Sequence, residues 1–232
     1  MRLERFRERA AEGWEEIPSE LREGVQALAV EDVVKPHPGL KGVHTLGECF
    51  TEEWPSQYGG QGETRSRLVL YYGSFQALAR LDGSFDWERE LWETVLHELL
   101  HHREAAAGER GLEEYDWAVE QNQRRHAGQS FDPAFYRAVP PGPDGTVRLE
   151  SDIFVEARMH RGGEARFGWR GETYGLRLPR DTRSAFVRVR NLAHGRLWVV
   201  VRETRPWWKV WGAPHPRAPV EVECRALPAP AD

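Results

Sequence analysis

The stretch that organises this sequence is Glu90-Leu-Trp-Glu-Thr-Val-Leu-His97-Glu98-Leu-Leu-His101-His102. His97 and His101 are four residues apart in it, and Glu98 follows the first histidine. Because an α-helix has 3.6 residues per turn, residues four apart lie one above the other on one face. Two imidazoles arranged in this way can bind one zinc ion at about 2.0–2.1 Å and leave a position open for water. The carboxylate of Glu98 is then placed to accept a proton from that water.

The residues around this motif predict an amphipathic helix. Taken at about 100° per residue, its apolar side consists of Leu91, Trp92, Val95, Leu96, Leu99 and Leu100. His97 and His101 point away from the centre of that side, so the helix can bury its apolar residues while both histidines face a cleft. Asp86 is a suitable N-cap. The alternative is a solvated polar face that carries two of the nine histidines, but the spacing and the helical context together favour a metal site.

A catalytic zinc site has a third protein ligand, and the helical pattern from Leu112 to Arg125 is where we expect it. The acidic residues within this segment or just before it are Glu109, Glu113, Glu114, Asp116 and Glu120. Glu113 and Asp116 lie one turn apart on one face, which suits a ligand and a hydrogen-bond partner that orients a ligand histidine. We predict Glu113 as the ligand, with Asp116 or Glu109 as its partner or its replacement. Glu104 is a weaker candidate.

Composition and charge narrow the class of protein. The chain has 232 residues, of which 40% are hydrophobic and 30% charged, as in a soluble globular protein with one large or two small domains. The net charge of −5 gives no support to nucleic-acid binding. Cys49 and Cys224 are too few for a disulfide framework, which suggests a reducing compartment. The N-terminus has no apolar signal core and no apolar run reaches membrane-spanning length. We therefore expect a cytoplasmic protein without a membrane partner.

The first half of the chain predicts a mixed α and β domain. Helical spacing runs from Leu3 to Ile17, and a Val-rich strand follows from Val25 to Val34. Residues 35–64 carry several prolines and glycines and are predicted to form a loop. A second strand, 67–72, could pair with an extended peptide substrate by strand addition. A short helix is expected at 74–81.

The second half predicts a separate β domain. Pro140-Pro-Gly-Pro-Asp-Gly145 is the predicted boundary between domains of residues 1–139 and 146–226. Beyond it, six short strands with no helix between them indicate a small sandwich or barrel, so that the fold class is α+β. The expected strands are 147–159, 164–169, 173–178, 185–189, 197–203 and 220–224. The tryptophans of segment Trp207–Trp211 are expected to pack across an open edge rather than to contact substrate.

The motif helix and its flanks resemble a known family. The residues concerned are Trp92-Glu-Thr-Val-Leu-His-Glu-Leu-Leu-His-His102, the preceding Leu70-Tyr-Tyr-Gly-Ser-Phe75, and the later segments Leu112-Glu-Glu-Tyr-Asp-Trp-Ala118 and Phe131-Asp-Pro-Ala-Phe-Tyr-Arg137. Together they are similar to the bacterial zincin-like metallopeptidase family, which is built on a minimal zincin domain, and the likeness covers residues 1–138. The resemblance implies a few-stranded sheet packed on the helix of the motif, bound Zn2+ and peptidase chemistry. Shorter members have a glycine and an acidic residue three and six positions after the second histidine. Here these places hold Glu104 and Ala107, so the third ligand is expected later in the chain.

From these observations we expect a zinc-dependent, peptidase-type hydrolase that acts on a peptide or protein. Glu98 would act as general base toward the attacking water and then protonate the leaving amine. Tyr115, His126 and Tyr136 are candidates for stabilising the oxyanion. Two other classes stay open: a peptide-binding or chaperone-like module with a structural or vestigial zinc site, and a metal-dependent hydrolase of another substrate. The sequence does not separate them, because a closed structural site and an open catalytic site share their ligand types.

Overall fold

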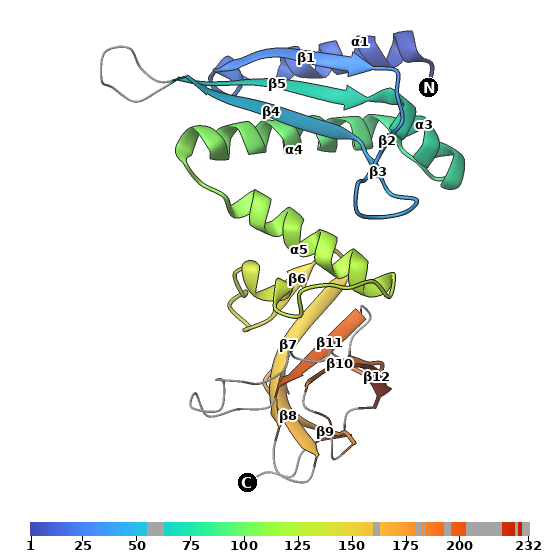
Figure 1. The fold of residues 1–232 in the computed structure, drawn as a ribbon, viewed down its shortest axis with the longest axis vertical. Helices are drawn as coiled ribbons and strands as arrows, with labels where there is room; N and C mark the ends of the chain where they lie inside the picture. Colours follow the sequence, from blue (N-terminus) through green and yellow to red (C-terminus); the bar gives the residue numbers. More distant parts are fainter. Residues whose placement is uncertain are drawn as a thin grey trace. The chain divides into compact units, whose positions relative to one another are not determined.

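The computed structural model describes residues 1–54, 63–159, 163–179, 182, 184–192, 196–202, 220–225 and 227–228. The fold is α+β, as predicted, with five α-helices and three β-sheets among these residues (Figure 1). The chain forms two compact units, Met1–Glu113 and Glu114–Asp232, and each is described in turn. None of the described helices combines the length and the apolar composition needed to cross a bilayer.

The first unit contains a three-stranded sheet in the order β1-β5-β4. The strand β1 (Val25–Glu31) runs parallel to β5 (Glu63–Tyr71), and β4 (Gly47–Trp54) runs antiparallel to it. The helices are α1 (Leu3–Glu16), α2 (Ser19–Arg22), α3 (Tyr72–Leu81) and α4 (Trp87–Ala107). The predicted helices and the two predicted strands are therefore present, although their ends differ by a few residues.

The prediction of a loop over residues 35–64 is wrong. This segment contains the short pair β2 (Lys35–Pro36) and β3 (His44–Thr45) and the whole of β4. The strand was missed because Gly47-Glu-Cys-Phe-Thr-Glu-Glu-Trp54 is too polar to show the alternation that marks a half-buried strand. Residues 55–62, which include Gly59, Gly60 and Gly62, lie outside the described residues.

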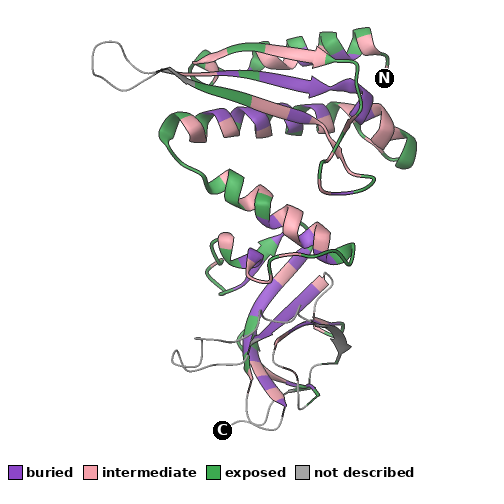
Figure 2. Ribbon diagram, viewed as in Figure 1, coloured by how far each residue is buried: buried purple, intermediate pink, exposed green. Residues whose placement is uncertain are grey.

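The central strand of this sheet is β5, which is drawn in purple along most of its length in Figure 2. Leu68, Val69 and Leu70 have no exposed surface. Both edges of β5 are paired, one with β1 and the other with β4. The prediction that residues 67–72 accept an added substrate strand is therefore wrong, because residues 67–70 of β5 are paired on both sides. Among the described strands, β4 is paired on one side only and forms an edge.

Helix α4 carries the motif and packs against β4 and β5. The predicted cap is confirmed, since a side-chain oxygen of Asp86 accepts bonds from the backbone N–H groups of Glu88 and Arg89 at 3.2 Å. The helix ends at Gly108, whose φ of 71° is the left-handed conformation that glycine adopts readily. Asp86 and Gly108 thus set where the helix that carries the motif begins and ends.

The buried side of α4 differs from the predicted one. It consists of Leu91, Thr94, Val95, Glu98, Leu99 and His102. Three residues predicted on the buried side are instead 37–48% exposed: Trp92, Leu96 and Leu100. The helix is rotated toward its polar residues because β4 begins with Gly47, which leaves room for Thr94 and Glu98 beneath the strand. Leu68 and Leu70 of β5 complete this core with Phe6 of α1.

The second unit is built on one eight-stranded sheet. Helix α5 (Gly111–His126), within which the two units divide, and the 3₁₀ helix η1 (Phe135–Ala138) precede it. The strands are β6 (Val147–Leu149), β7 (Asp152–Met159), β8 (Glu164–Trp169), β9 (Glu172–Arg177), β10 (Ser184–Val189), β11 (Arg196–Arg202), β12 (Val220–Cys224) and β13 (Leu227–Pro228). Their order is β12-β10-β11-β7-β8-β9-β13, and β6 pairs with β7. All six predicted strand regions are occupied, and the expected strand 147–159 is split by a turn at Glu150, whose φ is 50°.

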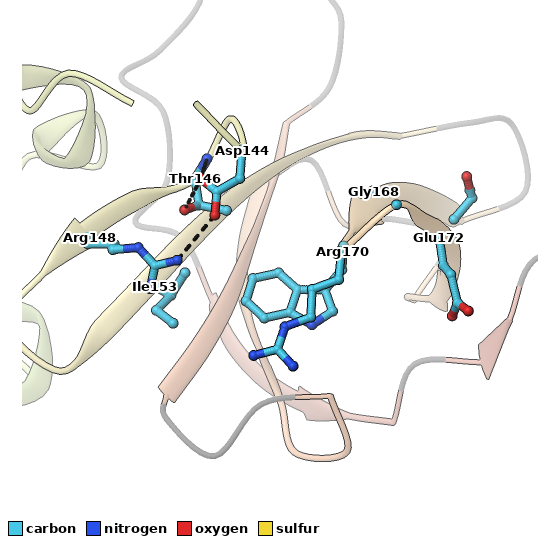
Figure 3. A pocket seen from close by; sticks show the side chains of 10 residues that line it. Asp144, Thr146, Arg148, Ile153, Gly168, Arg170 and Glu172 are labelled. Atoms are coloured by element: carbon cyan, nitrogen blue, oxygen red, sulfur yellow. Dashed lines mark hydrogen bonds and ion pairs between the residues drawn. The ribbon is translucent and has the colours of Figure 1, made fainter. Parts of the chain in front are cut away.

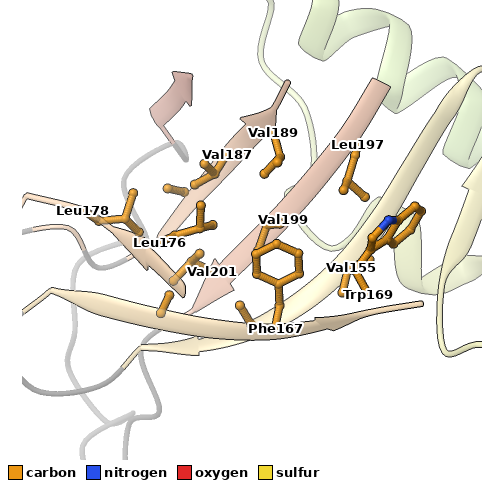
Figure 4. Close-up of a cluster of buried hydrophobic side chains, with 13 residues drawn as sticks. Val155, Phe167, Trp169, Leu176, Leu178, Val187, Val189, Leu197, Val199 and Val201 are labelled. Carbon is orange, nitrogen blue, oxygen red and sulfur yellow. The ribbon is translucent and has the colours of Figure 1, made fainter. Parts of the chain in front are cut away.

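The two faces of this sheet are buried in different ways. Alternate residues of β7 to β11 meet in a core on one face of the sheet, as Figure 4 shows for Phe167, Val187 and Val199. The residues between them point to the other face, where Phe154, Phe186 and Trp198 pack with Phe135 and Tyr136 of η1 and with Ala118 of α5. Residues 114–139 therefore belong to the hydrophobic core of the second unit.

The division between the units differs from the predicted boundary at residues 140–145. The compact units divide at Glu113 and Glu114, and the Pro-rich stretch lies inside the second unit. Its prolines and glycines form a turn, in which the N–H of Gly142 donates to the carbonyl of Thr146 at 2.8 Å. A high density of chain-breaking residues indicates a turn, and it does not show whether the segments on either side share a core.

Candidate metal centre

The two motif histidines lie side by side on α4. The ring centroids of His97 and His101 are 4.8 Å apart, and their planes are nearly perpendicular at 85°. Both side chains keep part of their surface open to solvent, unlike the fully buried residues on the sheet side of the helix. The helix thus brings two imidazoles within reach of one small ion, which is the arrangement that the spacing predicts.

Glu98 lies between the histidines in sequence and is 6% exposed. Its side chain extends beneath the start of β4. A Cβ placed on Gly47 would lie 2.8 Å from Cγ of Glu98, 3.0 Å from its Oε1 and 2.8 Å from Cγ2 of Thr94. Any side chain at position 47 would push the glutamate away, so this glycine sets how closely the carboxylate approaches the edge strand.

Cys49 lies two residues further along β4 and is half-buried. Burial raises the pKa of its thiol, and the charge of Glu98 acts in the same direction. A thiol is a poor nucleophile and a poor metal ligand until it loses its proton. Cys49 therefore behaves as a small packing residue of the strand.

His102 differs from the other two histidines of the motif helix. It is 1% exposed, its Nδ1 lies 2.7 Å from Oγ of Ser66, and its Nε2 lies 2.7 Å from the carbonyl oxygen of Glu23. A carbonyl only accepts, so Nε2 carries the proton and Nδ1 accepts from the serine. With both nitrogens bonded, His102 holds α4 to β5 and to the residues before β1. The sequence signal for this role is the spacing of Thr94, Glu98 and His102, four residues apart along one side of α4.

The structure assigns other contacts to several acidic candidates. Oε2 of Glu104 accepts the backbone N–H of Leu112 at 2.7 Å, so it serves the start of α5. Glu113 is 56% exposed and pairs with Arg110 at 2.8 Å. Glu109 is exposed. Asp116 lies on α5, in the second unit, and is half-buried.

The residues considered for oxyanion stabilisation take part in the packing of the second unit. The hydroxyl of Tyr136 donates to Glu156 at 2.6 Å, and its ring is almost fully buried among aromatic side chains. Tyr115 packs against the same cluster. Nε2 of His126 lies 2.5 Å from Oδ2 of Asp152. The tryptophans of segment Trp207–Trp211 lie outside the described residues.

Asp152 is the centre of a buried polar network that the sequence did not reveal. Its Oδ2 also accepts from Nδ2 of Asn122 at 2.8 Å and from Arg125 at 3.1 Å, and its Oδ1 pairs with Arg196 at 2.7 Å. Burial alone would raise the pKa of this carboxyl group, but hydrogen bonds from His126 and Asn122 outweigh it and lower the pKa to about 2. The Arg125 guanidinium stacks 3.9 Å from the ring centre of Trp198. The partners are 26 to 44 residues away from Asp152 in the sequence, so no local sequence pattern marks them.

Comparisons with known proteins add little to this description of the site. No family model matches the chain, and no curated protein matches it. A solved structure of a conserved hypothetical protein from Thermo thermophilus is similar to part of it, with 44% sequence identity. The match covers 46% of this chain and 98% of the other, with a TM-score of 0.40.

Proposed function

We propose that this protein is a zinc-dependent hydrolase of the peptidase type. The observation that carries the proposal is the pair of adjacent imidazoles of His97 and His101, followed on the same helix by Glu98, whose side chain is buried under an edge strand. A solvated helix face would leave all three side chains exposed and without a fixed relation to the sheet. We include in the proposal that the first unit is a minimal zincin domain, because its three-stranded sheet packs on the helix that bears the motif.

The donor set suits zinc better than a hard cation. Two neutral imidazoles and one carboxylate are common protein ligands of catalytic zinc, whereas magnesium and calcium prefer oxygen donors. For the third ligand we favour Asp116 over Glu113. Asp116 is half-buried on α5, whereas a residue that only solvates the helix surface is fully exposed. Glu113 is exposed and pairs with Arg110.

The proposed mechanism assigns separate tasks to residues of the first unit. Bound zinc would supply Lewis acidity toward the scissile carbonyl and toward water. Glu98, which directly follows His97 on the helix, would take a proton from the attacking water and deliver it to the leaving nitrogen. The open edge of β4 would bind the substrate as an added strand, because its backbone groups on that side have no described strand as a partner. A peptide carbonyl bound at Gly47 would then lie close to Glu98.

The test of this function compares two glutamate variants of α4. Glu98→Gln removes the proton acceptor and should lower kcat/KM for a library of quenched fluorescent peptides by about 10²–10⁴-fold while zinc content is unchanged. Glu93→Gln, at a position 63% exposed on the same helix, should leave the rate unchanged. If the zinc-loaded wild-type protein hydrolyses no peptide, or if Glu98→Gln is as active as wild type, the catalytic proposal fails. Zinc binding without hydrolysis would instead favour the peptide-binding or chaperone-like alternative.

A further inference from the structure

The second unit contains a cavity of about 570 Å³, which is far from the motif in sequence and independent of the proposed function. It is lined by Asp144, by Thr146 and Arg148 at β6, by Ile153 of β7, and by residues 168–173 of the β8–β9 hairpin (Figure 3). Its volume is in the range of small-molecule sites, which is about 300–1,000 Å³. Trp169 contributes an apolar wall, and its indole N–H is held by the carbonyl of Leu192 at 3.2 Å.

The turn of the hairpin places an arginine in an unusual conformation. Trp169 and Glu172 pair across the hairpin, so Arg170 and Gly171 form a two-residue turn with φ values of 51° and 84°. Such turns favour asparagine, aspartate or glycine at the first position, because a longer side chain is strained at positive φ. Strain of this kind is often found where a side chain has a binding role. A plain structural turn gives no reason for arginine here.

The guanidinium of Arg170 is available for a ligand. It stacks over the ring of Trp169 at 5.4 Å, and among the described residues it has no ion-pair partner. Arg148, the other arginine of the cavity, pairs with Asp144 at 3.1 Å, as the dashed line in Figure 3 marks. The carboxylate of Glu172 accepts a bond from Tyr174. The cavity thus presents one uncommitted positive group beside an aromatic wall.

The charge balance restricts the ligand further. Two arginines and two acidic residues line the cavity, so their formal charges cancel. A doubly charged phosphate would face the carboxylates of Asp144 and Glu172 with only one free guanidinium to offset it. A single carboxylate needs only one such group, which it can bind through two parallel hydrogen bonds. An apolar group next to that carboxylate would pack against Trp169 and Ile153.

We propose that this cavity binds a monocarboxylate that carries an apolar group, with Arg170 as the anion-binding residue and Trp169 as the apolar wall. The C-terminal residue of a peptide and a free organic acid share this chemistry. The two sources differ in what continues beyond the carboxylate-bearing residue, and a titration of the full chain distinguishes them.

The experiment is an NMR titration of the indole N–H signals with N-acetyl-phenylalanine and with the peptide acetyl-Gly-Gly-Phe, both with a free carboxylate. We expect saturable shifts with at least one of them and at least tenfold weaker binding of the matched C-terminal amide. A peptide that binds at least tenfold more tightly than the free acid identifies a peptide end as the ligand, and equal affinities identify the free acid. No saturable shift with either compound overturns the proposal, as does an amide that binds equally well.

Three variants locate the site. Arg170→Asn removes the guanidinium and relieves the turn, so Tm should stay equal or rise while binding weakens at least tenfold. At Gly168 a Cβ would meet nothing within 4 Å, so Gly168→Leu should fold normally and block the cavity. Arg177→Gln, at an exposed position on β9 that does not line the cavity, should bind as wild type does. Full binding by folded Arg170→Asn or Gly168→Leu protein would place the ligand elsewhere and refute the proposal.

Discussion

Single residues decide how α4 meets the sheet and what each of its histidines does. Gly47 admits the side chains of Thr94 and Glu98 beneath β4, and His102 is bonded through both ring nitrogens. His97 and His101, one turn apart on another side of the helix, keep solvent access. The structural role of His102 and the proposed metal-binding role of its neighbours are thus separated by a rotation of about 100° per residue along one helix.

Also at the residue scale, the pKa of Asp152 predicts how the stability of the second unit changes in acid. The pKa of this carboxyl group is lowered to about 2 in the folded state, against about 3.9 in an unfolded chain. The folded state therefore binds the proton less readily than the unfolded chain does. The stabilisation that the ionised carboxylate of Asp152 provides is complete above about pH 4 and is lost as the pH falls toward 2. Urea unfolding followed by circular dichroism between pH 5 and pH 2 should show this loss.

The matched variant is Asp152→Asn. It should remove this part of the acid dependence and destabilise the protein at neutral pH by about 3–5 kcal/mol, because Arg125 stays buried without its anion. An unchanged acid dependence in this variant would show that other carboxyl groups are responsible.

At the scale of elements, regular helices and strands with strong periodicity could be predicted, and polar edges could not. The limits of α4 follow from Asp86 and Gly108, and the strands of the second unit follow from alternation. Strand β4 was not predicted, because an edge strand needs no continuous apolar face. The buried side of α4 was partly misjudged because a wheel ranks residues by hydrophobicity, whereas a glycine on the facing strand decides which side chains have room.

The choice of the third zinc ligand is between two residues of α5. If Asp116 is that ligand, Asp116→Asn should weaken zinc binding by about 100-fold or more, since an amide is neutral and a weaker donor. Glu113→Gln, three residues away on the same helix, should change zinc affinity less than threefold because its carboxylate is exposed and pairs with Arg110. Competition with a chromophoric zinc chelator measures both. The opposite pattern would identify Glu113, the residue that the sequence alone favours.

At the scale of the whole molecule, the existence of two units could be predicted but the point of division could not. The sequence shows a change from helical to strand periodicity, and the prolines at 140–143 draw attention to the turn. The decisive feature is the packing of Phe135 and Tyr136 against Phe154 and Phe186, which joins residues on both sides of that turn. Contacts between distant aromatic residues have no local signature.

Two fragments test this division. Residues 114–232 should fold as a β-rich unit, whereas residues 146–232 should not, because they lack the side chains that cover one face of the sheet. Burial of each large apolar side chain contributes about 1.5–3 kcal/mol, so loss of Phe135 and Tyr136 alone removes about 3–6 kcal/mol. Thermal unfolding and the binding of an apolar dye, measured for both fragments, compare their stability and the exposure of their apolar side chains. Equal Tm values and no dye binding by the shorter fragment would restore the boundary at 140–145.

The most direct test of zinc binding at His97 and His101 is the zinc stoichiometry of the full chain, measured by elemental analysis after dialysis against a weak chelator. We predict one zinc per wild-type chain, one in Glu93→Gln, and none in the double variant His97→Ala and His101→Ala, with circular dichroism unchanged. Wild-type protein that takes up no zinc, or a folded double variant that still binds one, would contradict it.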